Sequence, residues 1–362
     1  MREYELEVLE QYDIEVKGTR KIRGAFFCDT NEGTMLLKEA DVSDRRAPLL
    51  YIVLKNLEQA GYPNVDTPVY NKEGALISVS RDGSRYMLKK WFSGRECDVK
   101  REFEVLQATR NLAQLHQKMQ WNQIAGNLVQ IDENADIPKV GVIHDLPGGS
   151  AAKAADQGIR PPTGRHLKDE FLRHNRELKK VRAFIRNKVS KGAFEFLFLE
   201  YFDQMYSLAE QVIRRLENSR YDSLYHESLE KLSLVHGDYN YHNVLFTSGG
   251  IAATNFDHFR VDVQAQDLYY FLRKVMEKHQ WQESLGKSMM EAYQEVRPLD
   301  TRELEYIALS LAYPEKFWKT ANTYYHSNKA WIPEKNVEKL QTAITQTEEK
   351  LRFLENIFTF NL

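Results

Sequence analysis

One thirteen-residue stretch, residues 234–246, restricts the possible folds of this chain more than any other part of its sequence. It begins with the apolar residues Leu234 and Val235, ends with an apolar run that closes at Phe246, and is polar in between. Short apolar runs on both sides of a polar loop predict two small buried strands that hold the loop in place. We therefore expect the chemistry of this chain in residues 236–243.

The polar residues of this loop have the order and spacing of a kinase catalytic loop. His236, Asp238 and Asn243 form the pattern His-x-Asp-x-x-x-x-Asn. In kinases the aspartate accepts the proton of the substrate hydroxyl, and the asparagine binds a metal ion. Gly237, at the position of the kinase arginine, makes the loop resemble that of aminoglycoside phosphotransferases and choline kinases. The pattern predicts Asp238 as the catalytic base, Asn243 as a metal ligand and His236 as a structural hydrogen-bonding residue.

The apolar periodicity predicts a small sheet followed by a helical region. Residues 13–90 have the pattern strand-strand-strand-helix-strand-strand, whereas helical spacing dominates from about residue 95. Residues 131–165 are rich in Gly and Pro and predict an irregular insertion. We predict an α+β, two-lobed protein kinase-like fold. A β-rich nucleotide-binding N-lobe would cover residues 1–92, and a larger, mostly helical C-lobe with the catalytic loop would cover residues 93–362.

Charge and composition exclude several classes of protein. The formal net charge is -2, so no global basic character points to nucleic acid. No apolar run approaches the ~20 residues that span a membrane, and the first ten residues lack the apolar segment of a signal peptide. Two cysteines form no disulfide framework and fit a reducing compartment. We expect a protein that is cytoplasmic at synthesis and binds neither membranes nor nucleic acid.

The phosphate-binding part of a kinase site needs a cation and a covering turn. Lys38 follows an apolar strand, at the place of the strand-borne kinase lysine, although a surface lysine on a strand is the alternative. Gly18, Thr19 and Gly24 lie in the first hairpin and are candidates for the turn that covers the phosphates. The sequence there is not Gly-x-Gly-x-x-Gly, and an ordinary hairpin would also explain the two glycines.

The second metal ligand and the helix acid depart from the kinase pattern. Asn255 stands at the position of the kinase metal-binding aspartate, and Asp257 follows two residues later. An asparagine oxygen can bind Mg²⁺, but the loss of a formal charge should weaken the site. The acid that pairs with the kinase lysine is expected near Leu50, where no acid occurs. Asp267 is predicted to be a helix N-cap that also braces the catalytic loop.

Several stretches together resemble the spore coat CotS family, a branch of the aminoglycoside phosphotransferase and choline kinase superfamily from spore-forming Firmicutes. They are residues 174–182, 236–243, 255–260, 267–278, 313–319 and 329–333. The resemblance covers nearly the whole chain. It implies a protein kinase-like fold, binding of ATP and Mg²⁺, synthesis in the mother cell, and association with the spore coat and its proteins.

The acceptor is expected to bind to the helical lobe. Residues 317–331 are rich in aromatic and cationic side chains, which suit a sugar-like or cationic small molecule. The candidate acceptor residues are Trp318, Tyr324, Lys329 and Trp331. The alternative is that the aromatic residues of this segment are core. Residues 173–191 carry eight Lys and Arg against one acid, which indicates a solvated helix face or a docking surface for an anionic partner.

Two hypotheses follow from these observations. The first is an ATP-dependent kinase for a small-molecule hydroxyl, with Asp238 as base, Asn243 and Asn255 or Asp257 on Mg²⁺, and Lys38 on phosphate. The second is a kinase-fold structural protein of the spore coat that binds nucleotide without turnover. The loop and Lys38 favour the first hypothesis, and Asn255 with the missing helix acid favours the second.

Overall fold

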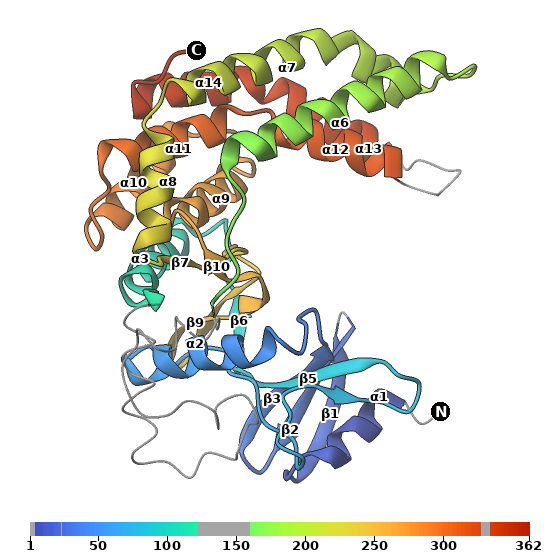
Figure 1. Ribbon diagram of the computed structural model, residues 1–362, viewed down its shortest axis with the longest axis vertical. Coiled ribbons are helices and arrows are strands. Elements are labelled where there is room, and N and C mark those ends of the chain that lie inside the picture. Colours follow the sequence, from blue (N-terminus) through green and yellow to red (C-terminus); the bar gives the residue numbers. More distant parts are fainter. Residues whose placement is uncertain (1–3, 23, 122–159, 327–333) are drawn as a thin grey trace. The chain divides into compact units, whose positions relative to one another are not determined.

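The computed structural model describes residues 4–22, 24–121, 160–326 and 334–362 (Figure 1). The chain divides into two compact units. Unit 1 comprises residues 1–163 and 228–267, and unit 2 comprises residues 164–227 and 268–362. Most of the predicted insertion (residues 131–159) and two candidate acceptor residues, Lys329 and Trp331, lie outside the described residues.

The first part of unit 1 is an antiparallel five-stranded sheet with the strand order β1-β2-β3-β5-β4. Its strands are β1 (Val16–Ile22), β2 (Ala25–Thr30), β3 (Gly33–Glu39), β4 (Ser78–Val79) and β5 (Arg85–Lys90). A short helix, α1 (Tyr4–Glu7), and a 3-10 turn, η1 (Val8–Gln11), precede the sheet. An Asp-Gly turn joins β4 and β5 in a hairpin, and Gly83 of this turn has a φ of +85°.

The two faces of this sheet have different neighbours. Alternate residues of a strand point to opposite faces. One face packs against the N-terminal turn in a cluster of apolar residues: Val8, Leu9, Tyr12, Phe26, Cys28, Met35, Leu37 and Leu88. The register pairs Lys38 of β3 with Met87 of β5, and Leu36 with Lys89. Directly opposed residues share a face, so Lys38 and Lys89 lie together on the face away from the cluster.

A single helix of the described residues, α2 (Ala47–Gln59), connects β3 with the later strands of the sheet. Its buried residues recur at the spacing of one helix face: Leu50, Val53, Leu54 and Leu57. The helix ends before Gly61, which has a φ of +80° and therefore accommodates the left-handed turn that terminates it. The single helix that the sequence pattern predicts after the first three strands is confirmed.

The rest of unit 1 contains α3 (Glu102–Lys118) and two small sheets. One sheet has the order β6-β8-β9, and β7 pairs with β10 in the other. The strands are β6 (Gly94–Glu96), β7 (Leu234–Val235), β8 (Val244–Thr247), β9 (Gly250–Ala253) and β10 (Arg260–Val261). A 3-10 turn, η2 (Phe256–His258), lies between β9 and β10. The polar loop is thus held between strands β7 and β8, as predicted from its apolar flanks.

Unit 2 is helical in its described residues. Its helices are α6 (Leu167–Asn187), α7 (Ala193–Glu217), α8 (Tyr221–Glu230), α9 (Ala265–Met276), α10 (Glu283–Gln294), α11 (Thr301–Ala312), α12 (Glu315–His326), α13 (Glu334–Thr345) and α14 (Thr347–Phe358), of which α8 and α9 run across the boundary with unit 1. An apolar core joins α6, α7, α12 and α13. In the described part of the chain, none of the helices combines the length and the apolar character that a membrane crossing would require.

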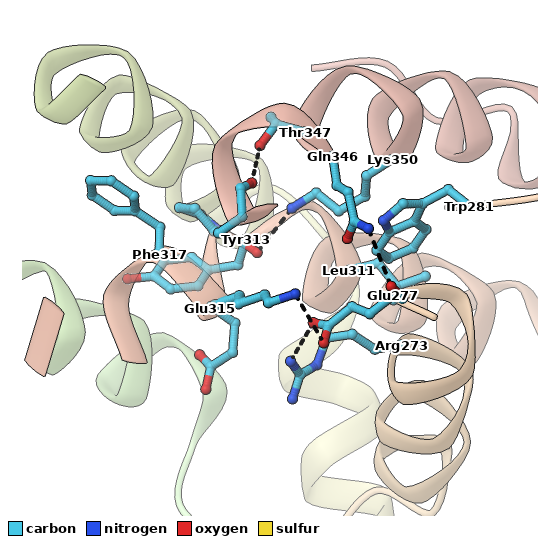
Figure 2. A pocket seen from close by; sticks show the side chains of 13 residues that line it. Arg273, Glu277, Trp281, Leu311, Tyr313, Glu315, Phe317, Gln346, Thr347 and Lys350 are labelled. Atoms are coloured by element: carbon cyan, nitrogen blue, oxygen red, sulfur yellow. Dashed lines mark hydrogen bonds and ion pairs between the residues drawn. The ribbon is translucent and has the colours of Figure 1, made fainter. Parts of the chain in front are cut away.

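Unit 2 also contains a pocket lined from α9, α11, α12, α13 and α14, which we name the α12 pocket (Figure 2). Its charged lining residues are Arg273, Glu277, Glu315, Lys316 and Lys350. Arg273 donates to Glu277 over 2.9 Å, and the Lys350 ammonium donates to backbone carbonyl oxygens over 3.2 and 3.3 Å. The pocket therefore holds buried charge. The acceptors of Lys350 are neutral carbonyl oxygens, whereas Lys316 lies 3.7 Å from a carboxylate oxygen of Glu277.

Two details of the predicted elements are wrong. Gly18 and Thr19 lie inside β1, opposite Asp29 and Cys28, and only Gly24 lies in the turn of the first hairpin, with a φ of +83°. The cross-strand pairing extends to Ile22, which leaves no wide loop between the strands. Asp267 is not an N-cap, because α9 begins two residues earlier, at Ala265.

Candidate functional site

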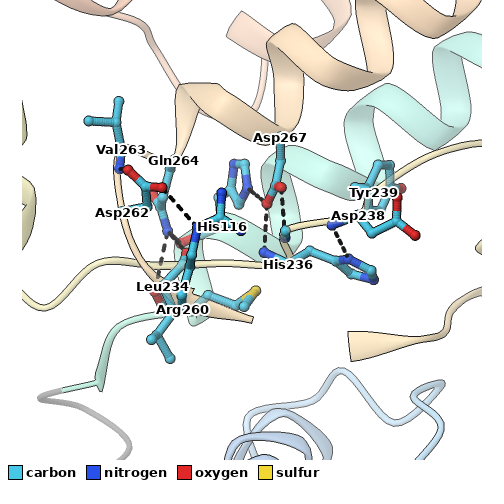
Figure 3. A network of polar contacts seen from close by, with 12 residues as sticks. His116, Leu234, His236, Asp238, Tyr239, Arg260, Asp262, Val263, Gln264 and Asp267 are labelled. Carbon is cyan, nitrogen blue, oxygen red and sulfur yellow. Dashed lines mark hydrogen bonds and ion pairs between the residues drawn. The ribbon is translucent and has the colours of Figure 1, made fainter. Parts of the chain in front are cut away.

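The loop of residues 236–243, predicted to be catalytic, begins at a backbone turn that Asp267 holds in place (Figure 3). The Asp267 carboxylate accepts the backbone N–H of His236 over 2.6 Å and that of Gly237 over 2.9 Å. It also contacts Nε2 of His116 over 3.1 Å. Gly237 has a φ of +83°, and a Cβ there would lie 2.2 Å from the carbonyl oxygen of His258. Only glycine fits this turn, and the carboxylate of Asp267 braces it as predicted.

Asp238 is held by side chains of its own loop. Its Oδ1 accepts from the amide of Asn240 over 3.0 Å, and its Oδ2 accepts from Nδ2 of Asn243 over 2.9 Å. The carboxylate remains partly exposed. His236 is fully buried, accepts the Asp238 N–H at Nδ1 over 3.2 Å and contacts the Thr254 carbonyl oxygen through Nε2 over 3.0 Å. Burial lowers the pKa of His236 and favours the neutral imidazole.

Asn255 links this loop to the following turn. Its side-chain amide donates to Oδ1 of Asn243 over 2.7 Å, and its backbone N–H donates to Oδ2 of Asp66 over 2.9 Å. Its φ is +64°, a left-handed conformation in which asparagine is enriched among non-glycine residues. Asn243 and Asn255, both predicted as metal ligands, are thus in direct contact with each other.

Lys38 extends from β3 to the same turn. Its ammonium donates to Oδ2 of Asp257 over 2.7 Å and lies 3.4 Å from Oδ1 of Asn255. Asp41, three residues along the chain, lies 3.5 Å from the ammonium. The helix position where a kinase has its acid is occupied by Leu50, which is fully buried in α2 and has no carboxylate. Asp257 instead provides the carboxylate that orients Lys38.

A second lysine in this site is absent from the sequence-based prediction. Lys89 of β5 is 1% exposed, and its ammonium donates to Oδ1 of Asp257 over 2.7 Å and to Oδ2 of Asp66 over 3.0 Å. Asp66 is fully buried. Burial alone would lower the pKa of Lys89, but Asp66 and Asp257 outweigh it and raise that pKa above its ordinary value. We name Lys38, Lys89, Asp66 and Asp257 the charge cluster.

The signal that could have revealed Lys89 is the strand register. Lys89 and Lys90 are adjacent in sequence at the end of β5, and a pair of lysines there is typical of a solvent-exposed strand end. In the structure Lys89 is buried, whereas the Lys90 side chain is 50% exposed and pairs with Glu58 of α2. Only the pairing of Lys38 with Met87, two residues before Lys89, shows that Lys89 shares the face of Lys38.

Comparison with known proteins identifies the family. Residues 173–357, just over half of the chain, match the family described as "Spore coat putative kinase YutH". The chain belongs to this family. It is also 22% identical over 358 residues to spore coat protein S of Bacillus subtilis (strain 168), a match that covers 97% of this chain and 93% of that protein. The resemblance to spore coat proteins is confirmed.

Solved structures similar to this family member include two phosphotransferases. An aminoglycoside phosphotransferase from Alicyclobacillus acidocaldarius has a TM-score of 0.75 at 18% identity, covering 98% of this chain and 95% of that chain. Spectinomycin phosphotransferase APH(9)-Ia, in complex with ADP and spectinomycin, has a TM-score of 0.62 at 12% identity, covering 95% and 97% of the two chains. At such identities the likeness shows the fold alone. The predicted α+β, protein kinase-like fold is confirmed.

The magnesium ion that this fold implies can be tested against the predicted ligands. In the described ranges, no group of three or more His, Cys, Asp and Glu side chains is placed to hold a metal ion. Asp257 is the one carboxylate among the three predicted ligands, and each of its oxygens accepts an ammonium group over 2.7 Å. Oδ1 of Asn243 accepts from Asn255. Mg²⁺ needs oxygen ligands with lone pairs directed to it, so these residues, as arranged, do not fit the ion.

The remaining predicted residues lie in different settings. A Cβ on Gly18 or Gly24 would meet no atom within 4 Å, so open space surrounds both positions, and their role toward phosphate stays a prediction together with that of Thr19. In unit 2, Trp318 stacks on His174 with ring centroids 3.4 Å apart. Tyr324 is 6% exposed and belongs to the apolar core. Their role toward an acceptor also stays a prediction.

Three of the eight basic residues in the segment 173–191, which begins in α6, form ion pairs. Within residues 173–191, Arg173 pairs with Glu177 over 2.9 Å, Arg182 pairs with Asp203 over 2.9 Å, and Lys188 pairs with Glu195. Such pairs on a helix surface are typical of the solvated face that was one of the two interpretations of this segment.

Proposed function

We propose that this member of the spore coat kinase family is a spore coat-associated protein that transfers phosphate from ATP to a hydroxyl group of a small molecule. Asp238 would act as the base for the acceptor hydroxyl, and Lys38 would bind the nucleotide phosphates. Spore coat association is inferred from the family and from the similarity to spore coat protein S. Nucleotide and small-molecule binding are inferred by analogy with the spectinomycin phosphotransferase complex.

The observation that carries this proposal is the contact between the strand lysine Lys38 and the turn after β9, which side-chain contacts join to the loop of residues 236–243. Lys38 comes from the sheet and Asp257 from the turn after β9, and their side chains meet over 2.7 Å. Asp238, Asn243, Asn255 and Lys38 are joined through consecutive side-chain contacts of 2.9, 2.7 and 3.4 Å. One network thereby holds the Lys38 ammonium, proposed to bind phosphate, and the carboxylate of Asp238. This supports the proposal, because phosphoryl transfer depends on the positioning of such groups.

The chemical role of each residue follows from its contacts. Asn240 and Asn243 each donate to one oxygen of Asp238, and this fixes the carboxylate while leaving its other lone pairs free to accept the hydroxyl proton. Lys38 is 18% exposed at its side chain, so its ammonium can reach a ligand while Asp257 orients it. In this proposal Asp238 accepts a proton and Lys38 positions the phosphates, and both residues belong to unit 1.

A direct test measures phosphoryl transfer from ATP to a panel of hydroxyl-bearing small molecules by the release of ADP. The substitution Asp238→Asn should lower the transfer rate about 10²–10⁴-fold, because it removes the base, and should leave the ATP affinity within about twofold. Asp203→Asn, in which a 78% exposed aspartate of α7 is changed, is the matched control and should transfer at the rate of the unmodified protein. The proposal fails if ATP does not bind, or if Asp238→Asn transfers as fast as the control.

A second function, nucleotide binding without turnover in a structural role, is favoured by one observation. Asn255 occupies the position of the kinase metal-binding aspartate, and its amide is already engaged with Asn243. If the unmodified protein binds ATP but transfers no phosphate across the panel, Asn255→Asp distinguishes the two functions. Recovery of transfer would identify Asn255 as the cause of inactivity. Continued absence of transfer would support the structural role.

A further inference from the structure

The charge cluster places two lysines on one aspartate. Lys38 of β3 and Lys89 of β5 lie on the same face of the sheet, and their ammonium groups contact the two different oxygens of Asp257 over 2.7 Å each. Only Lys38 has a counterpart in the kinase pattern. Lys89 therefore adds a positive charge beside the carboxylate that was predicted to bind a metal ion.

The position of Lys89 is fixed by burial and by a second carboxylate. Its side chain is 1% exposed, and Asp66, fully buried, contacts its ammonium over 3.0 Å. Asp66 also accepts the backbone N–H of Asn255 over 2.9 Å, so Lys89 is tied to the turn that carries Asn255 and Asp257. The formal charges of the two lysines and two aspartates of the cluster sum to zero, and the exposed carboxylate of Asp41 lies 3.5 Å from the Lys38 ammonium.

A divalent cation at Asp257 would have to compete with these ammonium groups. It would lie within a few ångströms of two positive charges in a buried environment, where electrostatic interactions are strong. Mg²⁺ also demands near-octahedral coordination by oxygen and releases its water reluctantly. The one carboxylate of the predicted ligand set is thus already neutralised by groups of the protein itself.

We propose that Lys89 takes the place of a divalent cation in this site, so that a nucleoside triphosphate binds beside Lys38 without Mg²⁺. The inference rests on the proposed function in one respect, namely that a nucleotide binds in unit 1. In this arrangement Lys38 contacts the phosphates, and Lys89 is a positioning residue that neutralises Asp257 and Asp66. A purely structural ion pair would stabilise the fold but would leave the metal requirement of nucleotide binding unchanged.

Calorimetric titration of the whole chain with ATP, once in EDTA and once in excess Mg²⁺, tests this inference. For the unmodified protein we expect dissociation constants that agree within about threefold between the two conditions. In Lys89→Met, where a metal ion has access to Oδ1 of Asp257, removal of Mg²⁺ should weaken binding at least about tenfold. Lys90→Met changes the neighbouring, half-exposed lysine and should behave as the unmodified protein.

The outcomes separate the inference from the proposed function. If ATP binds in neither condition, the proposed function fails. If the unmodified protein binds ATP only with Mg²⁺, the nucleotide site stands and the inference is overturned. If Lys89→Met is as independent of Mg²⁺ as the unmodified protein, the role of Lys89 is overturned. Should Lys89→Met not fold, the double substitution Asp66→Asn with Lys89→Met removes one charge of each sign, and the same gain in metal dependence is expected of it.

Discussion

Two regions of the molecule bury a lysine almost completely, and the two lysines have different partners. Lys89, in the charge cluster of unit 1, is 1% exposed and lies between the carboxylates of Asp66 and Asp257. Lys350, in the α12 pocket of unit 2, is 8% exposed and donates to the backbone carbonyl oxygens of Ala312 and Tyr313. The carboxylates raise the pKa of Lys89 against the effect of burial, whereas burial lowers the pKa of Lys350 to about 8.

This difference shows that burial alone does not decide whether a charge persists in a protein interior. In the charge cluster, Asp66 and Asp257 hold the pKa of Lys89 above its ordinary value, and Lys89 and Lys38 hold the pKa of Asp257 below its ordinary value, so Lys89 and Asp257 stay charged across the neutral pH range. In the α12 pocket, burial raises the pKa of Glu315 to about 7, because the opposing charge of Arg273 does not outweigh it. The first region is built to present fixed charge, which suits binding of phosphate. The second holds groups that change protonation near neutral pH.

The largest expected effect is the loss of stability in Lys89→Met. This change removes one partner of a buried ion cluster, which leaves Asp257 with Lys38 alone and takes from Asp66 the ammonium that it contacts. Breaking a buried pair in this way costs ~3–5 kcal/mol, mainly because an unpaired charge remains buried. Unfolding by urea, monitored by circular dichroism, should show the corresponding fall in the free energy of unfolding.

Lys90→Met is the control for this prediction, since it removes the neighbouring lysine from the same strand. The Lys90 side chain is 50% exposed and pairs with Glu58 over 3.1 Å. Exposed pairs contribute ~0–1 kcal/mol, so the free energy of unfolding should change by less than ~1 kcal/mol. Equal losses in the two variants would mean that the charge cluster contributes no more to stability than a surface contact does.

These lysines also show why the fold and part of the site could be predicted from the sequence. The loop of residues 236–243 is a local pattern, so the spacing of Asp238 and Asn243 between apolar flanks indicated both the loop and its strands. Lys38 was found because it follows an apolar strand at the expected place in the order of elements. Such local patterns can be recognised from residues that are neighbours in the sequence, so they predict an element without knowledge of distant contacts.

The residues missed or misplaced depend on contacts between distant segments. Lys89 joins the site through the register of β3 and β5, and Asp66 joins it through contacts with Lys89 and with the backbone of Asn255. Neither contact has a signature in the spacing of residues along the chain. Thr19 was placed in a turn because Gly18 precedes it, although a glycine at the start of a strand also accommodates a register shift, which the structure has between Val16 and Gly18.

An intermediate effect is expected for Glu315→Gln, and it depends on pH. The pKa of Glu315 is raised from 4.5 to about 7, so the stability that this group contributes is complete below pH 4.5 and is lost as the pH rises to 7. The glutamine variant cannot ionise and should not show this loss. Between pH 5 and pH 8, we expect the free energy of unfolding of the variant to rise by about 1–2 kcal/mol relative to that of the unmodified protein. The gain is no larger because a fifth of the Glu315 side chain still reaches solvent.

Free energies of unfolding at pH 5 and pH 8 measure this difference. Glu338→Gln, on an exposed position of α13, is the matched control and should follow the pH dependence of the unmodified protein. If Glu315→Gln and the control have the same pH dependence, Glu315 is ionised at no cost. The α12 pocket would then hold its charges as firmly as the charge cluster does.

The smallest effect is expected for Lys350→Met, the same substitution that should be most damaging at Lys89. At pH 7 the variant loses two hydrogen bonds to carbonyl oxygens, but it no longer has to bury an ammonium group. Because these two effects oppose each other, the free energy of unfolding should change by no more than ~1 kcal/mol. The pKa of Lys350 is lowered from 10.5 to about 8, so its contribution is complete above pH 10.5 and is lost as the pH falls to 8.

Stability measured from pH 8 to pH 10.5 should therefore rise less in Lys350→Met than in the unmodified protein. Glu277 and Glu315 favour the charged form of Lys350 and Arg273 opposes it, so these three residues have to be retained in both proteins. A loss at pH 7 as large as that of Lys89→Met would contradict the comparison, because it would show that two carbonyl oxygens sustain a buried charge as well as two carboxylates. A small loss, together with a flatter pH dependence, would show that the carboxylates of Asp66 and Asp257 are what make Lys89 a permanent cation.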